Sequence, residues 1–532
     1  MTAQPTGEPQ PPARKKSPRR SSPKPAPGGD TISGTIGSDA QGAIIGKNIF
    51  QSIIIVGSVK IPVIPVLILI LIVLAVAAFF GLRLLGPAQM TGAFNIAVAE
   101  FGQVGPNGQI SSSAKGQLIS LRLFEGLKIE LASLSPADRA NFQPQVWQDS
   151  LDITQKRVKI GIIPGDTPSE RWTAACDLAH QIHANVIIYG NLPPESGQAA
   201  FVPEFAICDN SNLRVDVDEI VGAHQLIQGL PAPLISQIGS PGTDLALNMR
   251  INSWNHVLAL FSIGVMYDLE GRSDLALGIF QQARDELKSG SASSGEVLWF
   301  FIGREELILA ARTAQDAAIS QARLDHLSSA QVAFEEALRQ NPAYARAHIG
   351  LGSVFFNRVL DTPPAGRLAS PDLAATLREY QQALDQAAGS PGALIDTKAR
   401  LGLASTWILQ GEAQRDLGQV SEAGASFDRA IQAAAGSIDP LKAANQYRVL
   451  AQAYLSLGEA YHEQGHLQLI QGDSVAARAS FEKASESYAS CIIQKDAAFT
   501  DQTLADKIVS GLCVPNKKIV DTALLDLEGL SK

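Results

Sequence analysis

Aromatic and charged side chains are both scarce in this chain. Phe, Trp and Tyr make up 6% of its 532 residues, and charged residues make up 18%. Much of the remainder is alanine and glycine. Because alanine has the highest helix propensity and lets helices approach closely, this composition favours closely packed helices. At about 100–200 residues per domain, the length allows about three or four units.

A net positive charge is confined to the amino-terminal part of the chain. Residues 1–60 hold eight basic and three acidic side chains, a balance of +5, while the whole chain carries −9. The part after residue 60 therefore carries −14. An acidic body neutralises phosphates poorly, so the sequence argues against nucleic-acid binding by this main part.

The sequence patterns of several enzyme classes are missing. There is no Gly-x-Ser-x-Gly, no glycine fingerprint of dinucleotide-binding domains and no kinase motif set. Gly42–Asn48 is similar to a phosphate-binding loop, but it has one residue too few between its glycines. Asn48 also replaces the Ser or Thr that would hold magnesium. We therefore expect no cofactor.

Cysteine occurs at four positions, Cys176, Cys208, Cys491 and Cys513, and none of them forms a Cys-x-x-Cys pair. A zinc knuckle or a thioredoxin motif is therefore not indicated. Two interpretations stay open. Outside the cytoplasm, Cys176 would pair with Cys208 and Cys491 with Cys513. Otherwise the four side chains would be buried free thiols.

The amino-terminal region divides into two segments of different composition. Residues 1–29 are rich in Pro, Lys, Arg, Ser and Gly. They cannot bury enough apolar surface to fold, so we expect a disordered basic tail. Residues 30–58 combine regularly placed Gly with isolated Ile, which predicts short β segments with tight turns.

Residues 61–82 contain no charged and no strongly polar side chain. A helix over this run is about 33 Å long at 1.5 Å per residue, enough to cross a hydrocarbon core of about 30 Å. Pro62 and Pro65 would lie in its first turn, where a missing N–H costs least. The sequence thus predicts one transmembrane helix, with the lipid bilayer as a partner and a single-pass protein in the cell membrane.

The alternative for the same run is a signal peptide cleaved after Ala77, but no short amino-terminal region precedes it. Orientation follows from the basic residues, which lie mainly on the amino side. The positive-inside rule places the tail in the cytoplasm and residues 86–532 outside it. The opposite orientation stays open.

Residues 92–230 alternate between strand and helix patterns and predict a small α/β domain with the order β-α-β-α-β-β. The expected strands are 93–101, 157–163, 185–190 and 198–208, and the expected helices are 118–131 and 169–183. The strand patterns at 93–101 and 184–190 resemble the amino-terminal type of TolB domain of bacterial envelopes. This resemblance implies a domain that makes protein–protein contacts and is not catalytic.

Residues 250–495 contain a repeated pattern of small and large residues. A Gly and a Tyr or Phe in one helix are followed by Ala, an aromatic residue and Ala in the next. This part resembles the tetratricopeptide repeat (TPR) family, which implies stacked helical hairpins with a groove for a protein or peptide. The residues that match are Gly264, Tyr267, Ala276, Phe280, Ala283, Gly303, Phe334, Ala337, Pro342, Gly352, Trp407, Gly411, Ala423, Phe427, Ala430, Gly458, Tyr461, Ala477, Phe481 and Ala484.

The predicted array is irregular. Insertions are expected around 312–328, 357–372 and 466–473, and residues 496–532 read as capping helices. In the fifth repeat, Gly458 and Tyr461 are assigned to the first helix and Gly465 to the turn.

One motif points to an enzyme, because His462-Glu463-Gln464-Gly465-His466 is a literal H-E-x-x-H. On a helix, His462 and His466 would bind zinc with Glu463 as general base, and Glu486 lies at the distance of a third ligand. However, a turn at Gly465 would end the helix between the two histidines. We therefore expect no catalytic residue here and keep these four residues as candidates for a metal site.

Taken together, these patterns predict an α+β multidomain protein with one transmembrane helix, a small α/β domain and an all-α TPR-like solenoid. The leading functional hypothesis is a membrane-anchored, non-enzymatic scaffold whose repeats capture a protein or peptide. One alternative is a membrane-tethered sensor whose α/β domain binds a small ligand. The other is a zinc peptidase.

Overall fold

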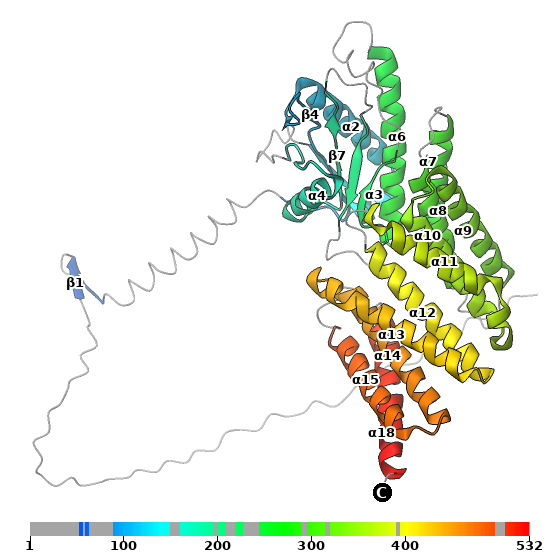
Figure 1. Cartoon of the computed structure of the whole chain (residues 1–532). Helices are drawn as coiled ribbons and strands as arrows, with labels where there is room; N and C mark the ends of the chain where they lie inside the picture. Colours follow the sequence, from blue (N-terminus) through cyan, green and yellow to red (C-terminus); the bar gives the residue numbers. More distant parts are fainter. Residues whose placement is uncertain are drawn as a thin grey trace, which may run out of the picture. The chain divides into compact units, whose positions relative to one another are not determined.

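The computed structural model (Figure 1) divides the chain into two compact units, Met1–Leu85 and Gly86–Lys532. The structure describes residues 53–56, 59–62, 89–148, 160–194, 201–208, 219–226, 244–289, 295–313, 320–389, 394–494 and 506–530.

In the first unit the described residues form one antiparallel pair of strands. Strand β1 (Ile53–Val56) pairs with β2 (Val59–Pro62), with Ile53 opposite Pro62. The disordered tail predicted for 1–29, and the part of the 30–58 segment before residue 53, lie outside the described residues.

The prediction of a transmembrane helix over 61–82 requires correction. Its first two residues, Ile61 and Pro62, belong to strand β2, and residues 63–82 lie outside the described residues. Among the described residues, no helix combines the length and the apolarity that crossing a bilayer requires. This finding contradicts the fold class with one transmembrane helix and the single-pass membrane localisation, and it leaves the bilayer without support as a partner. At its amino end the run starts with the β-branched Ile61, which pairs with Ile54 as part of the hairpin.

The second unit begins with a five-stranded sheet in the order β10-β9-β7-β3-β6. Strand β3 pairs in parallel with the edge strand β6 and with the central strand β7, whereas β9 pairs antiparallel with β7 and β10 pairs antiparallel with β9. A smaller sheet has the order β5-β4-β8. The strands are β3 (Asn95–Val98), β4 (Gly102–Val104), β5 (Ile110–Ser111), β6 (Gln145–Gln148), β7 (Val186–Tyr189), β8 (Asn191–Leu192), β9 (Glu204–Ile207) and β10 (Gly222–His224).

Helices cover both faces of the five-stranded sheet because its strands alternate their side chains between two cores. Ile96 and Ile188 pack with helix α2 (Ala114–Ala132), in a core that continues into the helical repeats. Ile187 packs with helix α4 (Pro168–Ile182) on the other face. The short helix α3 is Pro136–Phe142.

One strand was assigned wrongly from the sequence. Within the predicted strand 157–163, the described residues make only an isolated bridge from Ile162 to Glu100. The edge of the sheet is formed instead by β6, which the sequence analysis did not predict. Its four residues, Gln145–Gln148, carry two glutamines, so they lack a strong apolar alternation.

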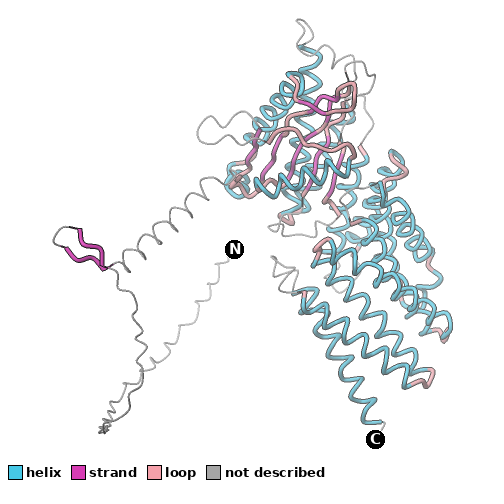
Figure 2. Tube along the Cα trace, turned by 60° about the vertical axis from the view of Figure 1, so that its left-hand side comes forward, coloured by secondary structure: helices cyan, strands magenta, loops and turns pink. Residues whose placement is uncertain are grey.

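The rest of the second unit consists of helices in antiparallel pairs, giving a TPR-like fold, and Figure 2 shows the strands confined to the α/β part of this unit. The described residues contain five hairpins: α6 (Asp244–Leu269) with α7 (Ser273–Ser289), α8 (Glu296–Thr313) with α9 (Gln321–Gln340), α10 (Ala345–Asp361) with α11 (Pro371–Gln386), α12 (Ile395–Asp416) with α13 (Val420–Ala443), and α14 (Tyr447–Ile470) with α15 (Ser474–Ile493). The remaining helical elements are η1 (Pro364–Ala369), η2 (Ala387–Gly389), η3 (Asp506–Cys513) and α18 (Val514–Leu530).

Each hairpin is closed by an aromatic ring of the second helix that lies against a glycine of the first. The ring of Phe280 occupies the space next to Gly264, where a Cβ atom would lie 2.4 Å from it. Phe334 is inserted between Gly303 of its own hairpin and Gly350 of the next. Stacked hairpins therefore share one core, as in other helical repeat arrays.

The fifth repeat has a different register from the predicted one. Helix α14 continues through Gly465 to Ile470, so the expectation that Gly465 forms the turn is wrong. Gly465 lies against Phe481, and Gly458 lies against Tyr488. The turn is made by Gly472, whose φ is +79°, a left-handed conformation that favours glycine. The segment 466–473 is thus the helix end and its turn, and not an insertion.

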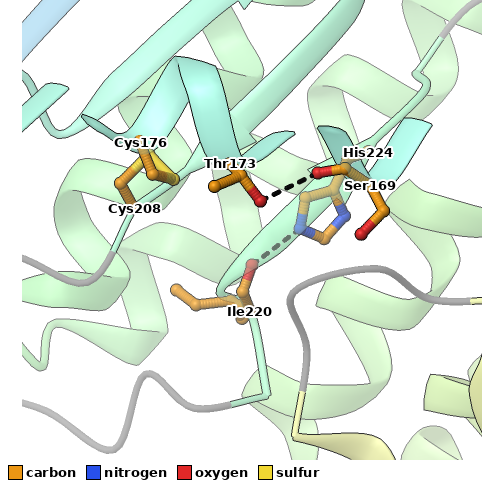
Figure 3. Close-up of a disulfide and its surroundings, with 6 residues drawn as sticks. All are labelled: Ser169, Thr173, Cys176, Cys208, Ile220 and His224. Atoms are coloured by element: carbon orange, nitrogen blue, oxygen red, sulfur yellow. Dashed lines mark hydrogen bonds between the residues drawn. A yellow bond between two sulfur atoms is a disulfide. The ribbon is translucent and has the colours of Figure 1, made fainter. Parts of the chain in front are cut away.

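The four cysteines form two disulfides. Cys176 of α4 pairs with Cys208, which follows β9, and Cys491 of α15 pairs with Cys513 of η3. Figure 3 shows the first of them on α4, where the Thr173 hydroxyl donates to the Ser169 carbonyl. The first disulfide ties a helix to the sheet that it covers, and the second ties the carboxyl-terminal cap to the last hairpin.

Candidate functional site

The first helices of the hairpins form a continuous surface, which we call the inner face. Helix α8 contacts α10, α10 contacts α12, and α12 contacts α14, in addition to their contacts with their own second helices. In helical repeat arrays the extended surface formed in this way is where partners bind.

Part of the inner face is covered by a segment of the α/β domain, residues 219–226. Arg346 of α10 donates from Nε to the Glu219 carbonyl at 3.1 Å and from Nη2 to the Val221 carbonyl at 2.9 Å. A longer contact of 3.5 Å joins its Nη1 to the Ala223 carbonyl. Arg346 is only 2% exposed. The inner face therefore holds a stretch of backbone, a turn at 219–220 followed by strand β10, through one buried guanidinium.

Two more cations of the inner face converge on the same segment. The Glu219 carboxylate lies 3.7 Å from Nε of Arg304 on α8 and 3.9 Å from Nζ of Lys398 on α12. The segment is thus held by three successive first helices. No sequence motif marks these three cations, because the segment 219–226 that they contact is far away in the sequence.

Aromatic packing excludes water from this contact. The His224 ring of β10 stacks on Phe205 at 5.1 Å between centroids and lies 5.8 Å from Phe301 of α8. Its Nε2 lies 2.6 Å from the Ile220 carbonyl, a contact drawn in Figure 3. Burial, and secondly the Arg346 charge, lower the pKa of His224 well below its usual value. His224 is therefore neutral, and the segment is buttressed by rings.

A buried charge network lies beside the segment. Arg304 donates from Nη1 to Asp268 at 2.5 Å and to Glu305 at 3.1 Å, and all three side chains are almost fully buried. Burial, and secondly the neighbouring Asp268 carboxylate, raise the pKa of Glu305 to about 8. Besides Glu219, the Arg304 guanidinium therefore faces two buried carboxyl groups, and Glu305 holds a proton at neutral pH.

Farther along the inner face, α12 and α14 present an acidic surface. It consists of Glu412 and Arg415 of α12 with Glu459 and Glu463 of α14, all partly exposed. Arg415 forms an ion pair with Glu463. Burial and the repulsion of Glu412 and Glu463 raise the pKa of Glu459 to about 7. Arg415 also attracts the Glu412 carboxylate, so this surface holds three carboxyl groups and one guanidinium.

The H-E-x-x-H motif lies on the same helix. Because α14 is continuous, His462 and His466 face one side, with their Nε2 atoms 3.0 Å apart and Phe481 beside both rings. Burial and the charges of His466 and Arg415 lower the pKa of His462 to about 4.

The carboxylates do not join the histidines in a metal site. Glu463 pairs with Arg415, and Glu486 is exposed on α15. Across the described residues, no group of three or more His, Cys, Asp or Glu side chains could hold a metal ion. Helix α14 thus brings His462 and His466 together, whereas Glu463 and Glu486 do not lie with them.

Comparison with known proteins adds little to this description. No family model and no curated protein matches the chain. Among solved structures, a crystal structure of a thermophilic TPR protein from Thermus thermophilus is similar at 16% identity and a TM-score of 0.24, covering 45% of this chain and 98% of that one. A TM-score this low does not establish a shared fold. The TPR-like fold therefore rests on the hairpins and their glycine–aromatic contacts.

Proposed function

We propose that this protein is a non-enzymatic interaction scaffold whose inner face binds an extended polypeptide segment of a partner protein. The observation that carries the proposal is the contact of Arg346 with the backbone carbonyls of residues 219–223. Carbonyl groups are common to all polypeptides, so a surface that binds one backbone segment in this way is suited to bind another.

The acidic surface on α12 and α14 is the part of the inner face that we assign to the partner. Glu412, Arg415, Glu459 and Glu463 are partly exposed, so a bound segment can reach them. With three carboxyl groups around one guanidinium, the surface favours a segment that carries Lys or Arg. A basic side chain close to Glu459 would also favour its charged form.

Affinity capture with the full chain tests this proposal. The double variant Glu412→Gln, Glu459→Gln removes acidic side chains while leaving the Arg415–Glu463 pair in place. The matched control, Glu482→Gln with Glu486→Gln, removes the same number of carboxyl groups from exposed positions of the second helix α15. We expect a partner that binds the native chain and the control alike, and the inner-face variant about 10-fold more weakly.

Raised salt should weaken the native complex as well, since charge pairs at a partly exposed surface are screened. Equal binding by both double variants would contradict the assignment of the partner to α12 and α14. Failure of the native chain to retain any protein would contradict the scaffold function itself.

A further inference from the structure

The α/β domain contains a cleft that is separate from the inner face. Its volume is about 730 Å³, and it is lined mainly by polar side chains: Asn107, Gln109, Asp166, Arg171, Asn191 and Glu204. Small-molecule sites commonly have about 300–1,000 Å³. The cleft is therefore large enough for a ligand of the size of a sugar.

The cleft lies where parallel backbone segments end. Strand β3 leads to Glu100, which bridges in parallel to Ile162, and strand β7 ends just before Asn191. The loop after Ile162 supplies Gly165 and Asp166 to the lining. Ligands of open α/β sheets bind outside the carboxyl ends of the strands, so the position is that of a binding site.

Among the described residues of the lining, the one cation is already paired. Arg171 donates from Nε and Nη2 to Glu204 at 3.2 and 2.6 Å, and from Nη1 to the Asp166 carbonyl at 3.3 Å. The Asp166 carboxylate is exposed and adds a negative charge. The lining is thus net acidic, which disfavours phosphates and carboxylates as ligands.

The start of helix α4 at the cleft offers no alternative anion site. Glu170 and Thr167 form a capping box, in which the Glu170 carboxylate also accepts from the backbone N–H of Asp166. The amide donors that would otherwise hold an anion are therefore occupied by the chain's own carboxylate.

One buried acceptor in the lining has no donor. Within the described residues, Oδ1 of Asn191 is buried and has no hydrogen-bond partner. An unpaired buried polar atom costs free energy, so such atoms commonly receive a bond from a ligand or water. The Asn191 oxygen can therefore accept a hydrogen bond from a hydroxyl or amino group of a ligand. The apolar part of the lining, which a sugar ring could contact, consists of Val104, Ile110 and Val202.

We propose that this cleft binds a small neutral molecule rich in hydroxyl groups, a mono- or disaccharide, with Asn191 accepting from one of its hydroxyls. Asn107, Gln109 and Asp166 at the rim supply further polar contacts. Neutral hydroxyls match an unpaired acceptor and a net acidic lining better than an anion does. This site does not depend on the scaffold function, because the inner face is formed by other elements.

Ligand-observed NMR with the full chain tests the proposal. The probes are a panel of neutral mono- and disaccharides at millimolar concentration, with inorganic phosphate and a diamine as comparators. We expect at least one sugar to bind and Asn191→Leu to weaken it about 10-fold. Asn252→Leu, an exposed amide on α6, is the matched control and should bind like the native chain.

A second variant, Asp166→Asn, guards against loss of folding at Asn191, because Asp166 is exposed. It should keep the native melting temperature and still bind the sugar more weakly than the native chain. Absence of sugar binding by the native chain would overturn the proposal. Preferential binding of phosphate or diamine, or equal sugar affinity in all variants, would also overturn it.

Discussion

At the scale of single residues, the array depends on glycines that make room for rings. In the first hairpin, Gly264 of α6 faces Phe280, whose ring fills the space that a side chain at position 264 would need. Gly278 of the same hairpin lies on α7 with nothing within 4 Å of its Cβ position. The two glycines therefore form a matched pair in which only the first is required by packing.

We predict that Gly264→Ala destabilises the chain by about 1–3 kcal/mol, because the added methyl overlaps the Phe280 ring. Gly278→Ala should be neutral or stabilise by up to about 1 kcal/mol, because alanine has the higher helix propensity. Urea unfolding of both variants measures the difference. Equal effects of the two substitutions would contradict the packing role of Gly264.

A second residue-scale prediction concerns the proton on Glu305. Its pKa is raised by burial and by Asp268 from an ordinary 4.5 to about 8. The folded state thus binds more protons than the unfolded state between these values. This contribution to stability is complete below about pH 4.5 and is lost as the pH rises through about 8.

Unfolding measured from about pH 5 to about pH 9 should therefore show stability falling with pH, and Glu305→Gln should flatten part of this slope. The control is Glu335→Gln on the exposed side of α9, which should keep the native slope. A slope unchanged in Glu305→Gln would show that another group accounts for the pH dependence.

At the scale of elements, the spacing between the packing glycine, the turn glycine and the aromatic ring could be predicted from the sequence. For the fifth repeat, however, the prediction assigned the wrong glycine. Gly264 precedes its turn glycine, Gly271, by seven residues and its ring, Phe280, by 16. Gly465 stands in the same relation to Gly472 and Phe481. The prediction took Gly458 as the equivalent of Gly264, because a Tyr follows each of them by three residues. It therefore placed the turn of the fifth repeat at Gly465, seven residues before the observed turn at Gly472.

Other features could not be read in this way. Strand β6 lacks a clear pattern, and the contacts of Arg346 join residues more than 120 positions apart. The two disulfide pairs were named from the sequence, but whether the four cysteines form disulfides or stay free thiols remained open, since it depended on the compartment. Helical hairpins were predictable because their packing repeats locally, whereas the covered part of the inner face depends on contacts distant in sequence.

The disulfide between Cys491 and Cys513 gives an element-scale prediction. It closes a loop of 22 residues between α15 and η3, which corresponds to about 3 kcal/mol in the chain-entropy account. The double variant Cys491→Ala, Cys513→Ala should accelerate amide exchange in η3 and α18. The control, Cys176→Ala with Cys208→Ala, should leave exchange in this cap unchanged, and acceleration by both would contradict a local role.

At the scale of the whole second unit, Arg346 joins the α/β domain to the repeats. We predict that Arg346→Met destabilises the chain by about 3 kcal/mol, because it leaves buried carbonyls without their charged donor. Amide exchange in residues 219–226 should rise more than in the sheet strand β3. Unchanged protection of 219–226 would show that the aromatic contacts alone hold the segment.

The central claim is that the inner face, and no other surface of the repeats, binds a partner polypeptide. Photo-crosslinking in the native host tests it most directly, with a photoreactive residue placed either at Glu412 on α12 or at Val332, an exposed position of the second helix α9. The account predicts a defined adduct from position 412, with the crosslinked peptide of the partner carrying Lys or Arg, and none from position 332. Adducts from position 332 alone, or equal adducts from both positions, would contradict it.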